Sequence, residues 1–74
     1  MVFEKIREVI CYQLDLDEDV VTLESIIRED LGADSLDLAD LVEIFEKEFD
    51  MSISDDDLEN IVTVGDLVRY IEEH

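Results

Sequence analysis

The stretch Asp34–Phe49, with the sequence DSLDLADLVEIFEKEF, decides the fold. At 100° per residue its apolar side chains form one stripe, which predicts an amphipathic helix from Leu36 to Phe49. Either Asp34 or Ser35 can cap the start of this helix, and the acidic Asp37 suits the positive end of the helix dipole. The predicted core face consists of Leu38, Leu41, Val42, Phe45 and Phe49.

The sequence on either side predicts three further helices. Apolar residues at helical spacing indicate a helix from about residue 2 to 14, and a long connection from Asp15 to Ala33 follows it. Because apolar residues are scattered along this connection, we expect it to pack on the domain, and loops of this length are often functional or contain a short extra helix.

A short third helix is expected near residues 55 to 61, with Ser54 as its cap and Asp57 completing a capping box. The last helix is expected to start after Thr63, with Asp66 three residues on, and to bury Val64, Leu67, Val68 and Ile71. The predicted fold class is therefore all-α: one domain, 1–74, built as a small antiparallel bundle of three principal helices plus one short helix, with a long first loop.

The charge of the chain limits its partners. Twenty-three acidic and five basic residues give a formal net charge of -18, while 47% of the residues are hydrophobic. Such a charge alone would favour disorder, but the regular apolar spacing favours a folded domain with an acidic surface. Nucleic acid and anionic membranes are excluded as partners, since both are bound through Lys and Arg. We expect transient binding to basic protein surfaces and, because like charges repel, a monomer.

The cellular location is predicted from what the sequence lacks. Its one cysteine, Cys11, cannot form an internal disulfide, so nothing indicates an oxidising compartment. No apolar run approaches the length that spans a membrane, and the first residues do not have the layout of a signal peptide. We therefore expect a cytoplasmic protein.

Leu36 does not fit the pattern of its own helix, because it falls on the face opposite the apolar stripe. Taken alone, an exposed leucine needs no explanation, and Ser35 beside it can be a simple helix cap. Alternatively, the serine hydroxyl, the exposed leucine and the neighbouring acids together form a docking and attachment site. A helix N-terminus would also favour a phosphate bound there. The residues alone leave both interpretations open.

The run Leu31-Gly32-Ala33-Asp34-Ser35-Leu36-Asp37 resembles the attachment motif of acyl carrier proteins, whose core is Asp-Ser-Leu. The similarity extends in family order over almost the whole chain. The further matching positions are Gln13-Leu14, Glu29-Asp30, Leu41-Val42, Glu46-Lys47-Glu48-Phe49-Asp50, Ile53, Ile61, Thr63, Val64 and Tyr70-Ile71.

This resemblance implies a free-standing carrier of the fatty acid synthesis type that is not itself an enzyme. Ser35 would receive a 4′-phosphopantetheine arm from coenzyme A, through a separate phosphopantetheinyl transferase that uses magnesium. Acyl groups would be carried on the arm as thioesters and presented to acyl-processing enzymes with basic patches. The implied docking residues are Asp34, Leu36, Asp37, Asp40, Glu46 and Glu48, and the implied lining of an acyl pocket is Leu41, Phe45 and Val68.

Three positions depart from the family pattern. Glu43, also on the docking face, replaces a residue that is often apolar, and Ala39 is smaller than the usual valine-like residue. Both indicate a partner preference that differs from the typical one. Ser54 replaces a common proline before the third helix, which should loosen that turn slightly.

Other functions fit the residues less well. A self-contained hydrolase lacks its parts, because the only histidine is His74 at the chain end and nothing activates Ser35 or Cys11. An EF-hand that begins at Asp15 fails, because Val20 and Ile26 replace the required glycine and bidentate glutamate. No dedicated metal site is predicted, although weak divalent binding at Asp55-Asp56-Asp57 stays open. The remaining alternatives are a polyketide or aminoacyl carrier and an unmodified acidic interaction module.

Overall fold

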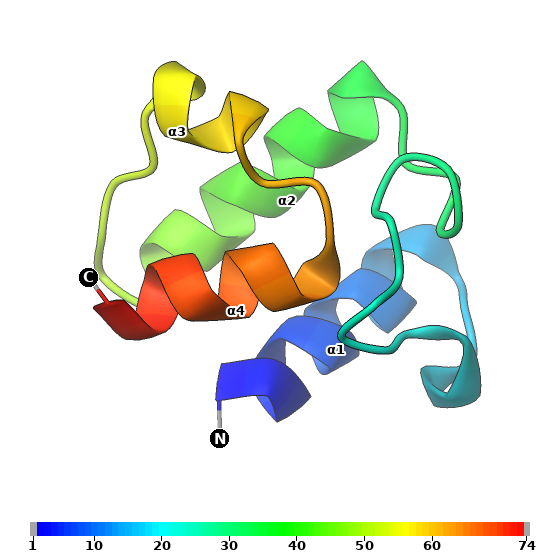
Figure 1. The fold of residues 1–74 in the computed structure, drawn as a ribbon. Coiled ribbons are helices and arrows are strands. Elements are labelled where there is room, and N and C mark those ends of the chain that lie inside the picture. Colours follow the sequence, from blue (N-terminus) through cyan, green and yellow to red (C-terminus); the bar gives the residue numbers. More distant parts are fainter. Residues whose placement is uncertain (1, 74) are drawn as a thin grey trace.

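The computed structural model describes residues 2–73, and within that range it is all-helical (Figure 1). The sequence analysis is confirmed on the fold class and on each helix, with boundaries that differ by no more than two residues. The elements in order are α1 (Val2–Leu14), a 3₁₀ turn (Glu18–Val20), α2 (Ser35–Glu48), α3 (Asp55–Glu59) and α4 (Val64–Glu73). His74, the histidine at the chain end, lies outside the described residues.

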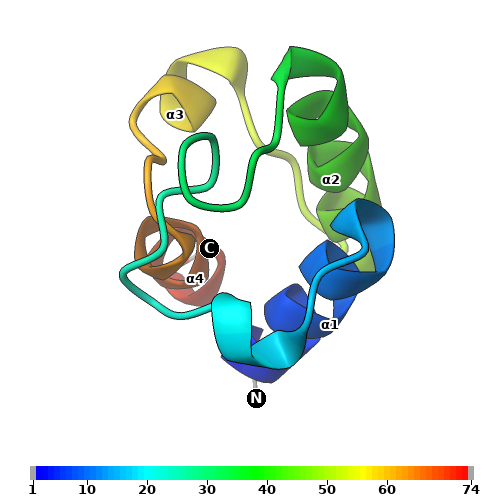
Figure 2. The same ribbon diagram turned by 90° about the vertical axis from the view of Figure 1, so that its right-hand side faces the viewer.

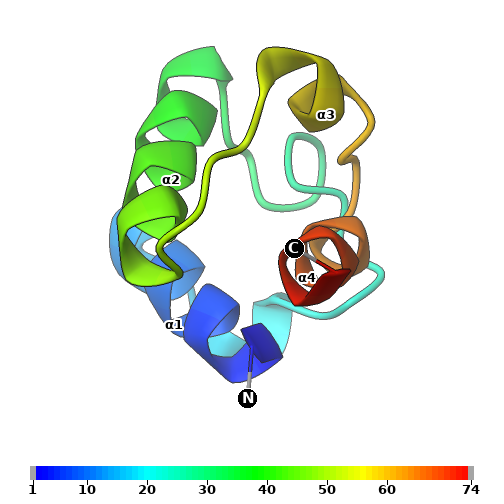
Figure 3. The same ribbon diagram turned by 90° about the vertical axis from the view of Figure 1, so that its left-hand side faces the viewer.

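The helices form a small antiparallel bundle. α1 runs in the opposite sense to α2 and α4 (Figure 1) and packs against both of them. Figure 3 shows α2 and α4 on opposite sides of the molecule, with α1 below and α3 above. An ion pair of 2.9 Å between Lys5 Nζ and a Glu48 carboxylate oxygen joins α1 to the end of α2.

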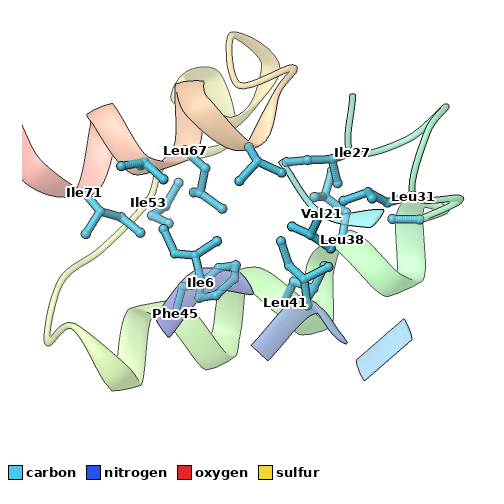
Figure 4. Packing of buried hydrophobic residues seen from close by; sticks show 14 residues of the cluster. Ile6, Val21, Ile27, Leu31, Leu38, Leu41, Phe45, Ile53, Leu67 and Ile71 are labelled. Carbon is cyan, nitrogen blue, oxygen red and sulfur yellow. The ribbon is translucent and has the colours of Figure 1, made fainter. Parts of the chain in front are cut away.

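The core lies between α2 and α4 and is completed by α1 and the long loop (Figure 4). Within the predicted stripe of α2, Leu38, Leu41 and Phe45 are buried, whereas Val42 and Phe49 are half-buried and pack against the cluster. All four predicted core residues of α4 are buried. The full cluster consists of Ile6, Ile10, Val21, Ile27, Leu31, Ala33, Leu38, Leu41, Phe45, Ile53, Val64, Leu67, Val68 and Ile71.

The long connection packs on the domain, as expected from its apolar residues, and it contains the 3₁₀ turn (Figure 2). Its middle part is bonded to the start of α4: the amide of Ile27 donates to the carbonyl of Val62, and the amide of Val64 donates to the carbonyl of Ser25, each at 3.0 Å. The amide of Gly65 donates to the carbonyl of Leu23 at 2.8 Å. A Cβ on Gly65 would lie 3.0 Å from that same oxygen, so this close approach favours glycine.

The third helix is capped differently from the prediction. The Ser54 hydroxyl accepts from the amide of Asp57 at 3.1 Å, as expected. However, the Asp57 carboxylate does not complete the capping box; it accepts a hydrogen bond of 2.8 Å from the Tyr70 hydroxyl on α4. This hydrogen bond raises the pKa of Tyr70 above its ordinary value. A tertiary contact has therefore replaced half of the local motif.

Candidate functional site

Two buried apolar residues hold the segment before α2 in place. Leu31 and Ala33 are buried, and the amide of Ala33 donates to the carbonyl of Ile27 at 3.2 Å. Gly32 between them has a φ of +75°, in the left-handed region that glycine adopts without strain. These contacts determine where α2 begins and on which side of the molecule its first turn is exposed.

Asp34, and not Ser35, is the cap of α2. Its backbone is extended, and its side chain accepts from the amide of Asp37 at 2.9 Å. The Asp37 carboxylate in turn accepts from the amide of Asp34 at 3.4 Å, which completes a capping box. The structure therefore decides between the two caps that the sequence allowed. Ser35 does not have the capping role that would otherwise explain its presence.

Ser35 is the first residue of α2, and its side chain is exposed. Within residues 2–73 its hydroxyl has no hydrogen-bond partner. Among the same residues the backbone N–H groups of Ser35 and Leu36 also have no acceptor, because the residues one turn earlier lie outside the helix. A nucleophilic oxygen thus lies beside two unused donors at the positive end of a helix dipole, an arrangement that fits a phosphate ester.

The surface around Ser35 combines one apolar side chain with several carboxylates. Leu36 is 76% exposed, so its predicted position away from the core is confirmed. Asp34, Asp40 and Glu43 are exposed on the same helix or at its cap. Neither of the two ion pairs in the described part of the chain reaches this turn. The surface is therefore apolar at one point and negative around it.

Four of the predicted docking residues already have partners within the domain, and two of them, Asp34 and Asp37, form the capping box. Glu48 pairs with Lys5. The Glu46 carboxylate accepts from the amide of Ile53 at 2.8 Å and so fixes the loop between α2 and α3. The sequence analysis predicted neither this contact nor the Lys5–Glu48 pair, because a carboxylate on a helix gives no local sign of a distant group that packs against it.

The predicted acyl-pocket residues lie in the packed core. Leu41 and Phe45 are each 1% exposed, and Val68 is 9% exposed. A separate surface cavity of about 440 Å³ is lined by none of the three. The sequence analysis did not find this cavity, because its lining comes from three segments far apart in the chain; their apolar residues are Ile26, Ile27, Leu38, Leu58, Ile61 and Val62.

Metal binding has little support from the geometry. In the range from Val2 to Glu73 no three carboxylate, histidine or cysteine side chains are placed to hold an ion together. Asp55, Asp56 and Asp57 lie in the first turn of α3, where they suit the helix dipole, and Asp57 is bonded to Tyr70. Over the same range no helix has both the length and the apolar character to span a membrane.

The fold is a small acidic helical bundle, and an exposed serine at the start of its second long helix takes no part in capping that helix. These features define a class, that of a carrier domain with an attachment site. The family model described as "Phosphopantetheine attachment site" matches residues 4–71. The chain belongs to this family and to its acyl carrier proteins. Members of this group have no catalytic activity of their own, so the chain is a carrier and not an enzyme, and its cofactor is 4′-phosphopantetheine.

The similarity to individual proteins covers nearly the whole chain. The acyl carrier protein of Clostridium perfringens is 49% identical over 72 residues, which are 97% of this chain and 95% of the relative. That of Thermotoga maritima is 53% identical over 72 residues, which are 97% of this chain and 89% of the relative. The solved structure of the acyl carrier protein from Enterococcus faecalis superposes with a TM-score of 0.83 at 40% identity, covering 97% of this chain and 91% of that one.

Proposed function

We propose that Ser35 is the residue that carries phosphopantetheine, and that the protein carries acyl intermediates for fatty acid synthesis. The observation that supports Ser35 is the division of roles at the start of α2. Asp34 and Asp37 complete the capping of the helix, so within residues 2–73 the Ser35 hydroxyl is exposed and has no hydrogen bond that must break before it reacts.

The residues of this chain position the arm and do not perform its chemistry. The free N–H groups of Ser35 and Leu36 would hold the phosphate, and Asp34 keeps the first turn rigid. When bound, the arm supplies a terminal thiol on which acyl groups are carried as thioesters. A transferase that uses coenzyme A and magnesium attaches it in this proposal.

The docking surface in this proposal centres on Leu36. Asp40 and Glu43 are exposed beside it and form no ion pair or side-chain hydrogen bond within the described residues, so they favour partners with an apolar pocket surrounded by Arg and Lys. Asp34 is also exposed, but its carboxylate accepts from the amide of Asp37. Asp37, Glu46 and Glu48 add negative charge but already have internal partners. A cytoplasmic monomer that meets its partners transiently belongs to the same proposal.

The acyl chain is proposed to enter among Leu41, Phe45 and Val68. Because these side chains are closely packed, the chain would have to separate α2 from α4 locally. The test is to load an octanoyl chain and to compare amide chemical shifts. Shifts at these three residues support the proposal, whereas shifts confined to Ile26, Leu38 and Leu58 would place the acyl chain in the surface cavity instead.

The decisive experiment is intact-mass measurement after incubation with coenzyme A, magnesium and a broad-specificity phosphopantetheinyl transferase. The native chain should gain one phosphopantetheinyl group, and Ser35→Ala should gain none. Ser52→Ala, which removes another exposed serine, is the matched control and should be modified like the native chain. If the folded native chain is not modified while a known carrier is, the acidic interaction module becomes the better explanation.

A further inference from the structure

A second exposed apolar surface lies between α1 and α2, on residues that the proposed carrier function does not use. Val9, Tyr12 and Ile44 line a groove of about 320 Å³, together with Glu8 and Gln13. We call these five residues the α1/α2 groove. The Lys5–Glu48 ion pair lies about one helical turn from Val9 on α1 and from Ile44 on α2, so it holds the two helices together near the groove.

Tyr12 is the residue in the groove that the fold does not explain. It is 86% exposed, more than Leu36, and it does not belong to the core cluster or to the side chains packed against it. In the part of the chain that the structure describes, its hydroxyl has no hydrogen-bond partner. Tyrosine is among the residue types that contribute most of the binding energy at protein interfaces, so an exposed tyrosine beside an apolar groove indicates a contact surface.

The charge around the groove selects its occupant. Glu8 lines it, while Glu4 and Asp40 lie one helical turn from Glu8 and Ile44 and are exposed. Two lysines lie at similar spacing: Lys5 is paired with Glu48, and Lys47 is exposed and offsets one of these acids, so the surroundings of the groove stay negative. With a net charge of -18, a second copy of this chain, a nucleic acid or an anionic membrane would be repelled. An arginine is favoured, because its guanidinium group can stack on the Tyr12 ring while it bonds to the Glu8 carboxylate.

We propose that the α1/α2 groove docks a basic amphipathic segment of a partner protein, with an apolar side chain between Val9 and Ile44 and an arginine over Tyr12. This surface is separate from the one around Leu36. Leu36 lies eight residues from Ile44 on α2, roughly 12 Å along the helix and about 80° around it. A partner in the groove would therefore leave the first turn of α2 accessible.

The test uses the full chain labelled with ¹⁵N and a synthetic probe. The probe is a 16-residue amphipathic helical peptide that has a leucine stripe flanked by arginines, and a second peptide has lysine at every arginine position. The arginine peptide should shift the amides of Val9, Tyr12 and Ile44 and should bind more tightly than the lysine peptide. Tyr12→Ala should weaken binding about tenfold, whereas Tyr12→Phe should retain it.

The matched control is Leu23→Ala, which removes an exposed leucine from another face and should leave peptide binding unchanged. Equal weakening by Leu23→Ala, or shifts that cluster at Leu36–Glu43, would overturn the proposal. So would dimers of the protein alone that Tyr12→Ala abolishes, since the groove would then be a self-association surface. Ser35→Ala should bind the peptide normally, so failure here is distinguishable from failure of the attachment site.

Discussion

The starts of α2 and α4 use the same local chemistry in two different environments. α2 begins with Asp34 and Asp37, and α4 begins after Thr63 with Asp66; in both helices side chain and backbone exchange hydrogen bonds three residues apart. The first turn of α4 is bonded to the long loop, and Val64 is completely buried. The first turn of α2 is exposed.

The difference shows that a capping box by itself does not say whether a helix start is structural or functional. At α4 the Asp66 carboxylate accepts from the amides of Thr63 and Val62, each at 3.1 Å, and these bonds lower its pKa. The donors at that end are thus used by the fold. At α2 the amides of Ser35 and Leu36 have no acceptor in the part of the chain that the structure describes, so they remain available to a ligand. Four predictions test this comparison.

The largest expected difference concerns the apolar residue at each start. Val64→Ala should lower the free energy of unfolding by about 2 kcal/mol, because it leaves a cavity at a fully buried site. Leu36→Ala should change it by no more than about 0.5 kcal/mol, because the side chain is mostly in water. Urea unfolding followed by circular dichroism measures both. A comparable loss in the two variants would contradict the contrast between a buried and an open helix start.

The second prediction concerns the acidic residues of the two capping boxes, Asp66 at α4 and Asp34 at α2. Asp66→Ala should cost about 1.5 kcal/mol, because it leaves the amides of Val62 and Thr63 without acceptors, the second of them half-buried. Asp34→Ala should cost about 1 kcal/mol or less, since water can reach the amide of Asp37. The same urea titration compares them. A larger loss of unfolding free energy in Asp34→Ala would mean that the capping box of α2 contributes more to stability than the capping box of α4.

The third prediction is a pH dependence at α4. The pKa of Asp66 in the folded state is lower than its ordinary value of 3.8. Its contribution is therefore fully present above the unfolded pKa of about 3.9 and is lost as the pH falls through the lower folded pKa. The stability difference between the native chain and Asp66→Asn should be constant from pH 7 to 5 and should shrink below pH 4. A difference that stays constant down to pH 3 would exclude this linkage.

The smallest effect on stability is expected from attaching phosphopantetheine to Ser35 at the exposed start of α2. A phosphodiester on Ser35 gains the dipole and free N–H groups of α2 but adds charge to an acidic chain. These effects oppose each other, so the unfolding free energies of the modified and unmodified chains should differ by less than about 1 kcal/mol. Urea titrations of both forms at low and high salt measure it. A large stabilisation would show that the first turn of α2 depends on the arm for its structure.

Most of the fold could be predicted from the sequence, because the information is local. Periodic apolar residues predict α1, α2 and α4, and because the chain has no proline, capping residues mark where the helices begin. The exposed position of Leu36 follows from the same periodicity. The role proposed for Ser35 does not, since serine is also a common cap, and this interpretation needed the resemblance to a known family.

What the sequence could not provide depends on contacts between distant segments. Asp34 and Ser35 are both good caps, and the structure shows that Asp34 is the one that accepts from the amide of Asp37. The bond between Asp57 and Tyr70 joins residues 13 positions apart, so the capping box expected at α3 was only half right. Tyr12 lies off the apolar stripe of α1 and became notable only when α2 placed Ile44 beside it.

The bonds between the long loop and the start of α4 also affect how the molecule opens. Loops usually exchange their amide hydrogens with solvent through local fluctuations. Here the amides of Ile27, Val64 and Gly65 donate hydrogen bonds that join the long loop to the start of α4. We expect them to exchange only when the whole domain unfolds, as core helices do. Because the amide of Ala33 donates to the carbonyl of Ile27, the turn before Ser35 is joined to the same hydrogen-bonded unit, and we expect it to hold Ser35 in one fixed position.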